Sequence, residues 1–274
     1  MDTTSSDDEP TVSGQPPPVL VFGSTDPCPS SVTGEPEILE VTKIFENASI
    51  PSCIYGIPAL SYYHAAQLQF DWEICLPSAM ADKAASLLKS EYSHVYEIFP
   101  GTTTRLFSII HIYPRFKVKG FDLSFIILPS DDYHFECTPS NIERSYKGLP
   151  YPKLAPFTQA VLDSNNMHYL TDLVDGMNLT EEWGQQNLEL SGTRDIAWIR
   201  RKNAKVRRLI PDPDESCWYE LPEGEEGLTR KDTYENIVRT KERRIGVECP
   251  KEVYATRFCG HGDGDPRLNI RHLF

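Results

Sequence analysis

The sequence has little positive charge. Its 27 lysines and arginines stand against 40 aspartates and glutamates, so the 274-residue chain carries a formal net charge of −13. Because affinity for phosphate backbones depends on a basic surface, this balance argues against a general nucleic-acid-binding protein. Long apolar runs are missing, so we expect no membrane-spanning helix, and the basic and hydrophobic regions of a signal peptide are missing too.

Cysteine pairs and the common catalytic motifs are also absent. The seven cysteines form no C-x-x-C pair, which indicates neither a zinc knuckle nor a disulfide framework. We therefore expect a cytoplasmic protein in a reducing compartment. The chain contains no G-x-x-x-x-G-K-[ST], G-x-G-x-x-G or G-x-S-x-G, so P-loop, dinucleotide-binding and hydrolase sites lack support.

Two weaker patterns suggest metal chemistry. His134-Phe135-Glu136 has the H-x-E spacing of zinc deaminases, but no P-C-x-x-C follows, and we interpret His134 as a strand residue. The segment 259–265 gathers a cysteine, a histidine and two aspartates among three glycines. Ordering so flexible a loop costs considerable entropy, so we predict no metal site there.

Residues 1–36 differ from the rest of the chain. They contain seven prolines, eleven serines or threonines, six acidic residues and no lysine or arginine. Such a segment cannot bury enough apolar surface to offset its ordering entropy, so we predict a disordered acidic tail. The remainder is long enough for one compact core with an appended subdomain. We expect an α/β core over residues 37–150 and a helical region over residues 151–274.

The spacing of apolar residues predicts the elements of both parts. In the first part, strands are expected over residues 52–55, 105–113, 116–129 and 133–137 and through Asp71-Trp72-Glu73, with helices from Glu37 and from an N-cap at Ser78. The strands over 105–113 and 116–129 should pair as a hairpin. In the second part, helices are expected near residues 153–162, 169–177, 181–188, 193–209 and 231–244.

The most informative segment runs from Gly56 to Asp71-Trp72-Glu73. A glycine turn opens a short helix, and a strand with two carboxylates follows. Side chains two residues apart in a strand share a face, so Asp71 and Glu73 should point the same way. Two adjacent carboxylates can bind a hard divalent cation such as Mg²⁺. A half-exposed strand shows the same alternation, and both carboxylates would then be solvated while Gly56 merely turns the chain.

This layout resembles the nucleotidyltransferase superfamily, particularly its branch of bacterial abortive-infection toxins. In that branch a Gly-Gly-[Ser/Thr]-Ala-Leu segment precedes an Asp-x-Asp strand at similar spacing. Gly56, Ala59-Leu60 and Asp71 match the motif, and Glu73 stands at its second carboxylate. The resemblance implies an α+β fold with a mixed sheet flanked by helices. It also implies magnesium-dependent transfer from a nucleoside triphosphate, with Asp71 and Glu73 as catalytic metal ligands and Gly56 shaping the nucleotide-binding turn.

Several positions depart from this family. Ile57 and Pro58 stand where it has a second glycine and a hydroxyl residue, and proline offers no backbone N–H to a phosphate. The family's third carboxylate is replaced by Ser124 or Phe125, unless a different register brings in Asp122. The departures favour a degenerate protein that keeps the fold as a nucleotide-binding or interaction module. Whether catalysis is retained, and on which acceptor, stays open.

The chain is also similar to a set of uncharacterised fungal proteins. They share the segments 148–154, 175–184 and 264–267, and the likeness covers most of residues 50–267. It brings no assigned activity, and some members are encoded beside genes for secondary metabolism. An accessory role in such a pathway, without nucleotide chemistry, is the alternative function.

A predicted helix carries seven basic side chains between residues 194 and 208. One interpretation is a surface facing phosphate or RNA, with one or two arginines contacting a triphosphate. The other is an amphipathic helix whose apolar residues, Ile199 and Val206 among them, face the core while the charges are solvated. The acidic balance of the chain favours the second interpretation, and we expect Trp183 and Trp198 to fill a helical core.

Overall fold

The computed structural model describes residues 34–65, 71–100, 104–223, 228–246, 249–262, 264–265 and 267. All of them belong to one compact unit that spans residues 32–272. The predicted acidic tail lies, up to residue 33, outside the described residues. In the described part of the chain, no helix is long and apolar enough to cross a membrane. The division of the compact unit at residue 150 stays a prediction.

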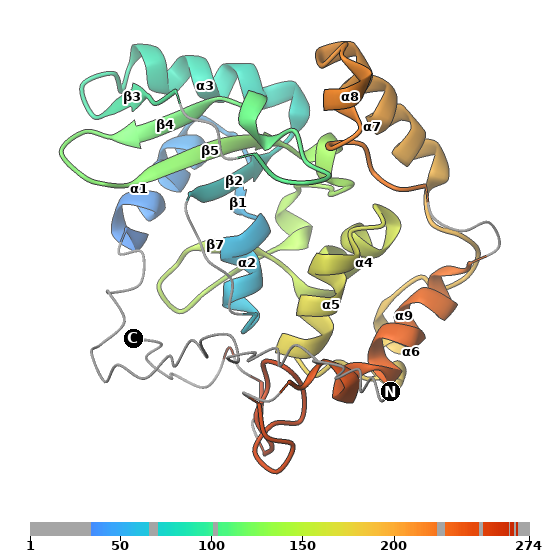
Figure 1. Cartoon of the computed structure of the whole chain (residues 1–274). Helices are drawn as coiled ribbons and strands as arrows, with labels where there is room; N and C mark the ends of the chain where they lie inside the picture. Colours follow the sequence, from blue (N-terminus) through green and yellow to red (C-terminus); the bar gives the residue numbers. More distant parts are fainter. Residues whose placement is uncertain are drawn as a thin grey trace, which may run out of the picture. The chain divides into compact units, whose positions relative to one another are not determined.

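The first half of the chain contains helices and most of the strands, and helices dominate the second half (Figure 1). The helices are α1 (Glu35–Asn47), α2 (Gly56–Tyr62), α3 (Ala81–Ser90), α4 (Leu154–Asp163), α5 (Met167–Gly176), α6 (Glu181–Asn187), α7 (Ile196–Leu209), α8 (Pro213–Ser216) and α9 (Arg230–Arg239). The strands are β1 (Cys53–Ile54), β2 (Trp72–Leu76), β3 (Tyr96–Ile98), β4 (Arg115–Val118), β5 (Ser124–Pro129), β6 (Ile142–Arg144) and β7 (Pro150–Pro152). The predicted α+β class is confirmed.

A five-stranded mixed sheet organises the first half. Its order is β1-β2-β5-β4-β3, and β2 and β5 run parallel while the other neighbours are antiparallel. In Figure 1, α3 lies over one side of the sheet and α2 and α5 lie on the other. Because both faces are covered, every residue of β2 is buried. The other two strands, β6 and β7, form a separate hairpin.

The helices follow the predicted apolar spacing closely. In α1, Ile38, Val41 and Phe45 are fully buried, and the helix begins two residues before the predicted start. The helices α4, α5, α6, α7 and α9 all lie where the periodicity predicts them. Helices of this kind bury one stripe, so the spacing of a few apolar residues is enough to locate them.

The strand predicted over residues 105–113 is wrong. That segment contains only an isolated bridge between Arg105 and Ser108 and a 3₁₀ turn. Ile109 and Ile110 are consecutive and both buried, which the two-residue alternation of a half-exposed strand does not permit. The hairpin forms instead between β4 and β5, around Gly120 with its positive φ of 82°.

Two further predictions are wrong, one after β5 and one after β2. Residues 133–137 form no edge strand, since a 3₁₀ turn, η3 (Ser130–Tyr133), leads into His134 in the left-handed conformation, with φ 51°. Ser78 caps no helix with its side chain. Its hydroxyl oxygen accepts a hydrogen bond of 2.9 Å from the backbone N–H of Asp131 instead. This contact ties the end of β2 to the connection after β5.

Candidate functional site

Asp71 and Glu73 lie on the same face of the sheet, as predicted. Glu73 stands beside Ile126 of β5, and Ile126 stands beside Arg115 of β4, so these three side chains share one face. Asp71 lies just before β2 and accepts hydrogen bonds from Arg115 and Ser124 on the same face. Neither carboxylate is solvated, because Asp71 is 1% and Glu73 0% exposed. The alternative interpretation of a half-exposed strand is therefore wrong.

Arg105 neutralises the buried carboxylate of Glu73. Its Nη1 lies 2.8 Å from Glu73 Oε1 and also donates to the hydroxyl of Tyr169, on α5, at 3.3 Å. Neither Glu73 oxygen accepts a well-directed hydrogen bond from a described residue, so the contact with Arg105 is an ion pair. Burial raises the pKa of Glu73, and the positive charge of Arg105 only partly opposes that rise.

The glycine turn fits directly against Glu73. Gly56 has a positive φ of 62°, and a Cβ atom built there would lie 2.0 Å from Glu73 Oε2. Any other residue would both strain the backbone and displace a buried carboxylate. Gly56 and Glu73 therefore lie together as the motif implies, but the contact that requires glycine is with the protein's own carboxylate.

Asp71 is neutralised by a second arginine. Arg115 Nε and Nη2 lie 2.8 Å and 2.7 Å from Asp71 Oδ1, and the guanidinium stacks over the ring of Phe99 at 4.6 Å. The hydroxyl of Ser124 donates to the same oxygen. Asp122 is fully exposed and pairs with Lys117 at 3.1 Å. The register therefore brings Ser124, and not Asp122, to the position beside Asp71.

These residues, Gly56, Asp71, Glu73, Arg105, Arg115 and Ser124, form what we call the carboxylate site. Its donor set does not fit Mg²⁺, which requires octahedral oxygen ligands and usually keeps several waters. Each carboxylate already carries a guanidinium, and the third position holds a hydroxyl that donates its hydrogen. Within the described ranges, no group of three or more His, Cys, Asp or Glu side chains could hold a metal ion.

A second cluster of charges lies beyond the other end of β2 and β5, against α7. Asp195 caps α7, accepting from the backbone N–H of Trp198 at 2.8 Å and contacting His134 Nε2 at 3.1 Å. The indole N–H of Trp198 donates to the carbonyl oxygen of Asp131 at 2.8 Å. Polar contacts thus hold α7 against the connection that follows β5.

The most deeply buried of these contacts centres on Asp132. Lys202 and Lys205 lie 3.4 Å and 2.5 Å from its carboxylate, and the hydroxyl of Tyr113 donates to it. Burial lowers the pKa of Lys202 to about 8, with Asp132 opposing the shift. Burial alone would raise the pKa of Asp132, but Lys202, Lys205 and Tyr113 outweigh it and lower that pKa.

These contacts correct the amphipathic interpretation of α7. Ile199 and Val206 are fully buried as predicted, yet Lys202 is also buried, at 6% exposed. Trp198 is only partly buried and lines a groove, so it does not fill a helical core. A signal was present in the sequence. Lys202 stands three residues after Ile199, within the apolar stripe, where a lysine requires a buried partner.

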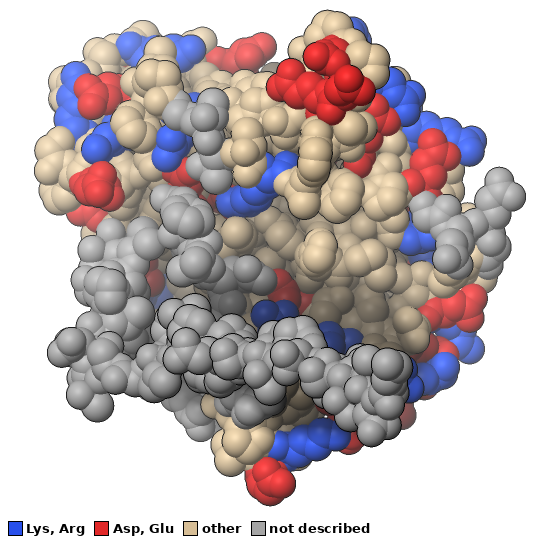
Figure 2. Space-filling view, in the orientation of Figure 1, with Lys and Arg blue, Asp and Glu red and all other residues tan. Residues whose placement is uncertain are grey.

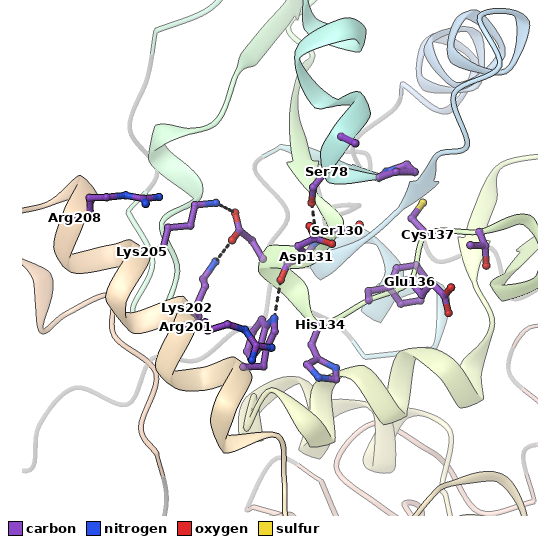
Figure 3. Close-up of a pocket in the computed structure, with 16 residues that line it drawn as sticks. Ser78, Ser130, Asp131, His134, Glu136, Cys137, Arg201, Lys202, Lys205 and Arg208 are labelled. Atoms are coloured by element: carbon purple, nitrogen blue, oxygen red, sulfur yellow. Dashed lines mark hydrogen bonds and ion pairs between the residues drawn. The ribbon is translucent and has the colours of Figure 1, made fainter.

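The groove beside α7 has a volume of about 880 Å³, and we call it the α7 groove. Figure 3 shows basic side chains of α7 on one side, with Asp131 and His134 facing them and Glu136 and Cys137 beyond. Its lining residues are Pro77, Ser78, Ala79, Ser130, Asp131, Asp132, His134, Phe135, Glu136, Cys137, Thr138, Trp198, Arg201, Lys202, Lys205 and Arg208.

Comparisons with known proteins add no family assignment. Neither models of protein families nor curated protein sequences match this chain.

Proposed function

We propose that this chain is a nucleotidyltransferase-like protein whose catalytic site is silent and which acts as a nucleotide-binding or interaction module. The observation that carries the proposal is the pairing of both motif carboxylates with arginines. Arg115 and Arg105 stand beside Asp71 and Glu73, where a catalytic member of the family would bind divalent cations.

The order of elements supports the relation to that fold. A short strand, β1, leads into the Gly56 turn and α2, and β2 then carries the two carboxylates. The parallel neighbour of β2 is β5, which bears Ser124 beside Asp71. A strand, a glycine turn, a helix and a carboxylate strand in this order are what the sequence resemblance implies.

The charges support the loss of catalysis. Metal-assisted nucleotidyl transfer uses carboxylates to hold cations that neutralise the reacting phosphates. At the carboxylate site the arginines already supply the neutralising charge, and burial leaves 1% or less of either acidic residue exposed. Pro58 has no N–H for a phosphate at the turn. The family resemblance implies magnesium binding at Asp71 and Glu73, but their pairing with arginines favours a site that binds no divalent cation.

The test is an assay for transfer of labelled nucleotide to RNA, protein and small-molecule acceptors, with each of the four nucleoside triphosphates and with Mg²⁺ or Mn²⁺. We expect no incorporation by the purified full-length protein. Asp71→Asn, which keeps the shape of the side chain, is the matched variant. Robust transfer by the native protein that Asp71→Asn abolishes would overturn the proposal.

A further inference from the structure

The α7 groove lies at the carboxyl ends of two neighbouring parallel strands. Pro77 and Ser78 follow β2, Ser130 follows β5, and all three line the groove. Open α/β sheets commonly bind ligands in the crevice outside the carboxyl ends of their strands. The carboxylate site lies toward the opposite, amino-terminal end, where Asp71 precedes β2 and Ser124 begins β5. The two sites are therefore distinct.

Four cationic side chains of α7 line this groove: Arg201, Lys202, Lys205 and Arg208. Arg201 and Arg208 are exposed, and neither has an ion-pair partner within 4.0 Å among the residues that the structure describes. Lys202 and Lys205 share the single carboxylate of Asp132. On a chain with a net charge of −13, a groove wall with four cations is a local exception. It favours an anionic ligand.

The spacing of the two arginines and the volume of the groove indicate which kind of anion would fit. Arg201 and Arg208 are seven residues apart on α7, which places them roughly 10 Å apart along the helix axis. Guanidinium groups bind phosphate oxygens through paired hydrogen bonds. The volume of about 880 Å³ is within the range of pockets that hold organic molecules and is much larger than one phosphate ion needs.

The wall opposite α7 offers hydrogen-bond acceptors, and Trp198 of α7 itself adds an aromatic surface. Asp131 and Glu136 are exposed carboxylates that can accept hydrogen bonds from hydroxyl or amino groups. Trp198 lines the groove, with its ring packed edge to face against His134 at 5.1 Å. A ligand that suits both walls carries phosphate at one end and an uncharged hydrogen-bonding group at the other.

We infer that the α7 groove is a binding site for a phosphate-bearing organic molecule of nucleotide size, whose phosphates lie between Arg201 and Arg208. The site needs no divalent cation, because the cationic groups are supplied by α7. This inference does not rest on the proposed relation to nucleotidyltransferases, since no residue of the carboxylate site lines the groove.

The test compares two double variants of the full chain by isothermal titration calorimetry in the presence of EDTA, with ATP, pyrophosphate and adenosine as probes. Arg201→Gln with Arg208→Gln removes the two groove arginines. Arg200→Gln with Arg207→Gln removes the same charge from the same helix, at exposed residues that pair with Glu223 and Glu220 and do not line the groove. Circular dichroism checks that both variants fold.

We expect native protein to bind ATP more tightly than it binds pyrophosphate. It should not bind adenosine measurably. The groove variant should bind ATP at least about tenfold more weakly, because charge-assisted contacts to phosphate are lost, and the control variant should bind within about twofold of native protein. Equal weakening in both variants would overturn the inference, as would the failure of native protein to bind either phosphate probe. A transfer-active protein that still binds ATP through the groove would contradict only the proposed function.

Discussion

The charged side chains at the two ends of the parallel pair β2 and β5 are paired differently. At the amino-terminal end, Asp71 and Glu73 are buried and each is matched by one arginine. Beyond the carboxyl end, one buried carboxylate, Asp132, serves two lysines while further arginines of α7 stay exposed and unmatched within the described ranges. The charges at the first end are paired one to one. The second end has the exposed arginines on which we base the inferred anion site.

The carboxylate site matches a sequence motif, whereas the α7 groove matches none but is open to a ligand. The carboxylate site has the residue types that suggest catalysis, but its two carboxylates are buried and paired with arginines. A buried ion pair stabilises little in total, yet breaking it leaves an uncompensated charge that costs far more. The α7 groove has no motif, but its charges face an open volume (Figure 3).

In Figure 2, acidic side chains of α8 lie beside the basic side chains of α7.

The largest expected effect comes from removing one partner of a buried pair. Arg105→Met should lower the free energy of unfolding by about 3–5 kcal/mol near neutral pH, because Glu73 is then buried without a counter-charge. Urea denaturation measures the change. The control is Arg144→Met, which breaks an exposed pair with Glu46 and should cost about 1 kcal/mol or less.

The cost of Arg105→Met should shrink as the pH falls. Burial raises the pKa of Glu73 in the folded protein, so its protonated form is favoured by folding. A raised pKa contributes stability that is present below the unfolded value and is lost as pH rises through the folded value. Removing Arg105 raises that pKa further, so the deficit should be smaller near pH 5 than near pH 7. A deficit that does not change with pH would show that Glu73 is not the residue left unpaired.

The next effect isolates the contact between the glycine turn and Glu73. Gly56 and Gly120 both have positive φ, but a Cβ atom at Gly120 has no atom within 4 Å. Gly120→Ala should therefore cost only the backbone strain of about 1–2 kcal/mol. Gly56→Ala should cost at least about 2 kcal/mol more, because it displaces a buried carboxylate. Equal losses of unfolding free energy would mean that the turn does not hold Glu73.

A smaller effect concerns the groove and pH. Lys202 faces Asp132 and the ring of Tyr133, with Lys205 nearby, and its pKa is lowered to about 8. Burial raises the pKa of Tyr133 well above its ordinary value, so that side chain stays neutral while Lys202 titrates. Above about pH 7.5 the phosphates of ATP are already ionised. ATP affinity in EDTA should then fall about three- to fivefold between about pH 7.5 and about pH 9.5, as Lys202 loses its proton.

Lys202→Met is the matched variant for that titration. Asp132 keeps Lys205 and Tyr113 as partners, so the substitution leaves no uncompensated carboxylate. The variant should bind ATP with little dependence on pH over the same interval. A pH dependence as steep as that of native protein would assign the titration to another group.

An effect of similar size tests the third position of the carboxylate site. Ser124→Ala removes one hydroxyl donor from Asp71, which keeps its ion pair with Arg115. The free energy of unfolding should fall by about 1 kcal/mol, the usual net value of one hydrogen bond. Thermal and urea denaturation give the value. An unchanged free energy of unfolding would mean that Ser124 does not help to hold Asp71.

Much of the fold followed from local patterns in the sequence. The helices were predictable because a few apolar residues at helical spacing mark the buried stripe, as in α1. The turn at Gly56 and the shared face of Asp71 and Glu73 also followed from spacing. The segment 105–113 was misjudged because its burial depends on contacts with distant residues, such as the backbone bond between Phe107 and Trp218. Alternation alone does not register such contacts.

The partners of the carboxylates were not predictable from one sequence. Arg105 lies 32 residues from Glu73 and Arg115 lies 44 residues from Asp71 along the chain. The sheet register brings Arg115 to Asp71, and the folding of an irregular segment brings Arg105 to Glu73. The α7 groove was missed for the same reason, since Ser78, Ser130 and Arg201 come from three separate segments. The polar residue Lys202 within the apolar stripe of α7 was a local sign of it.

The central claim is that arginines, and not divalent cations, neutralise Asp71 and Glu73. Titration of native protein with Mn²⁺, followed by electron paramagnetic resonance of the free ion, tests it most directly. We predict no stoichiometric site, with any binding weaker than about 1 mM, and the same titration curve for Asp71→Asn. One equivalent of tightly bound Mn²⁺ in native protein that Asp71→Asn loses would contradict the claim.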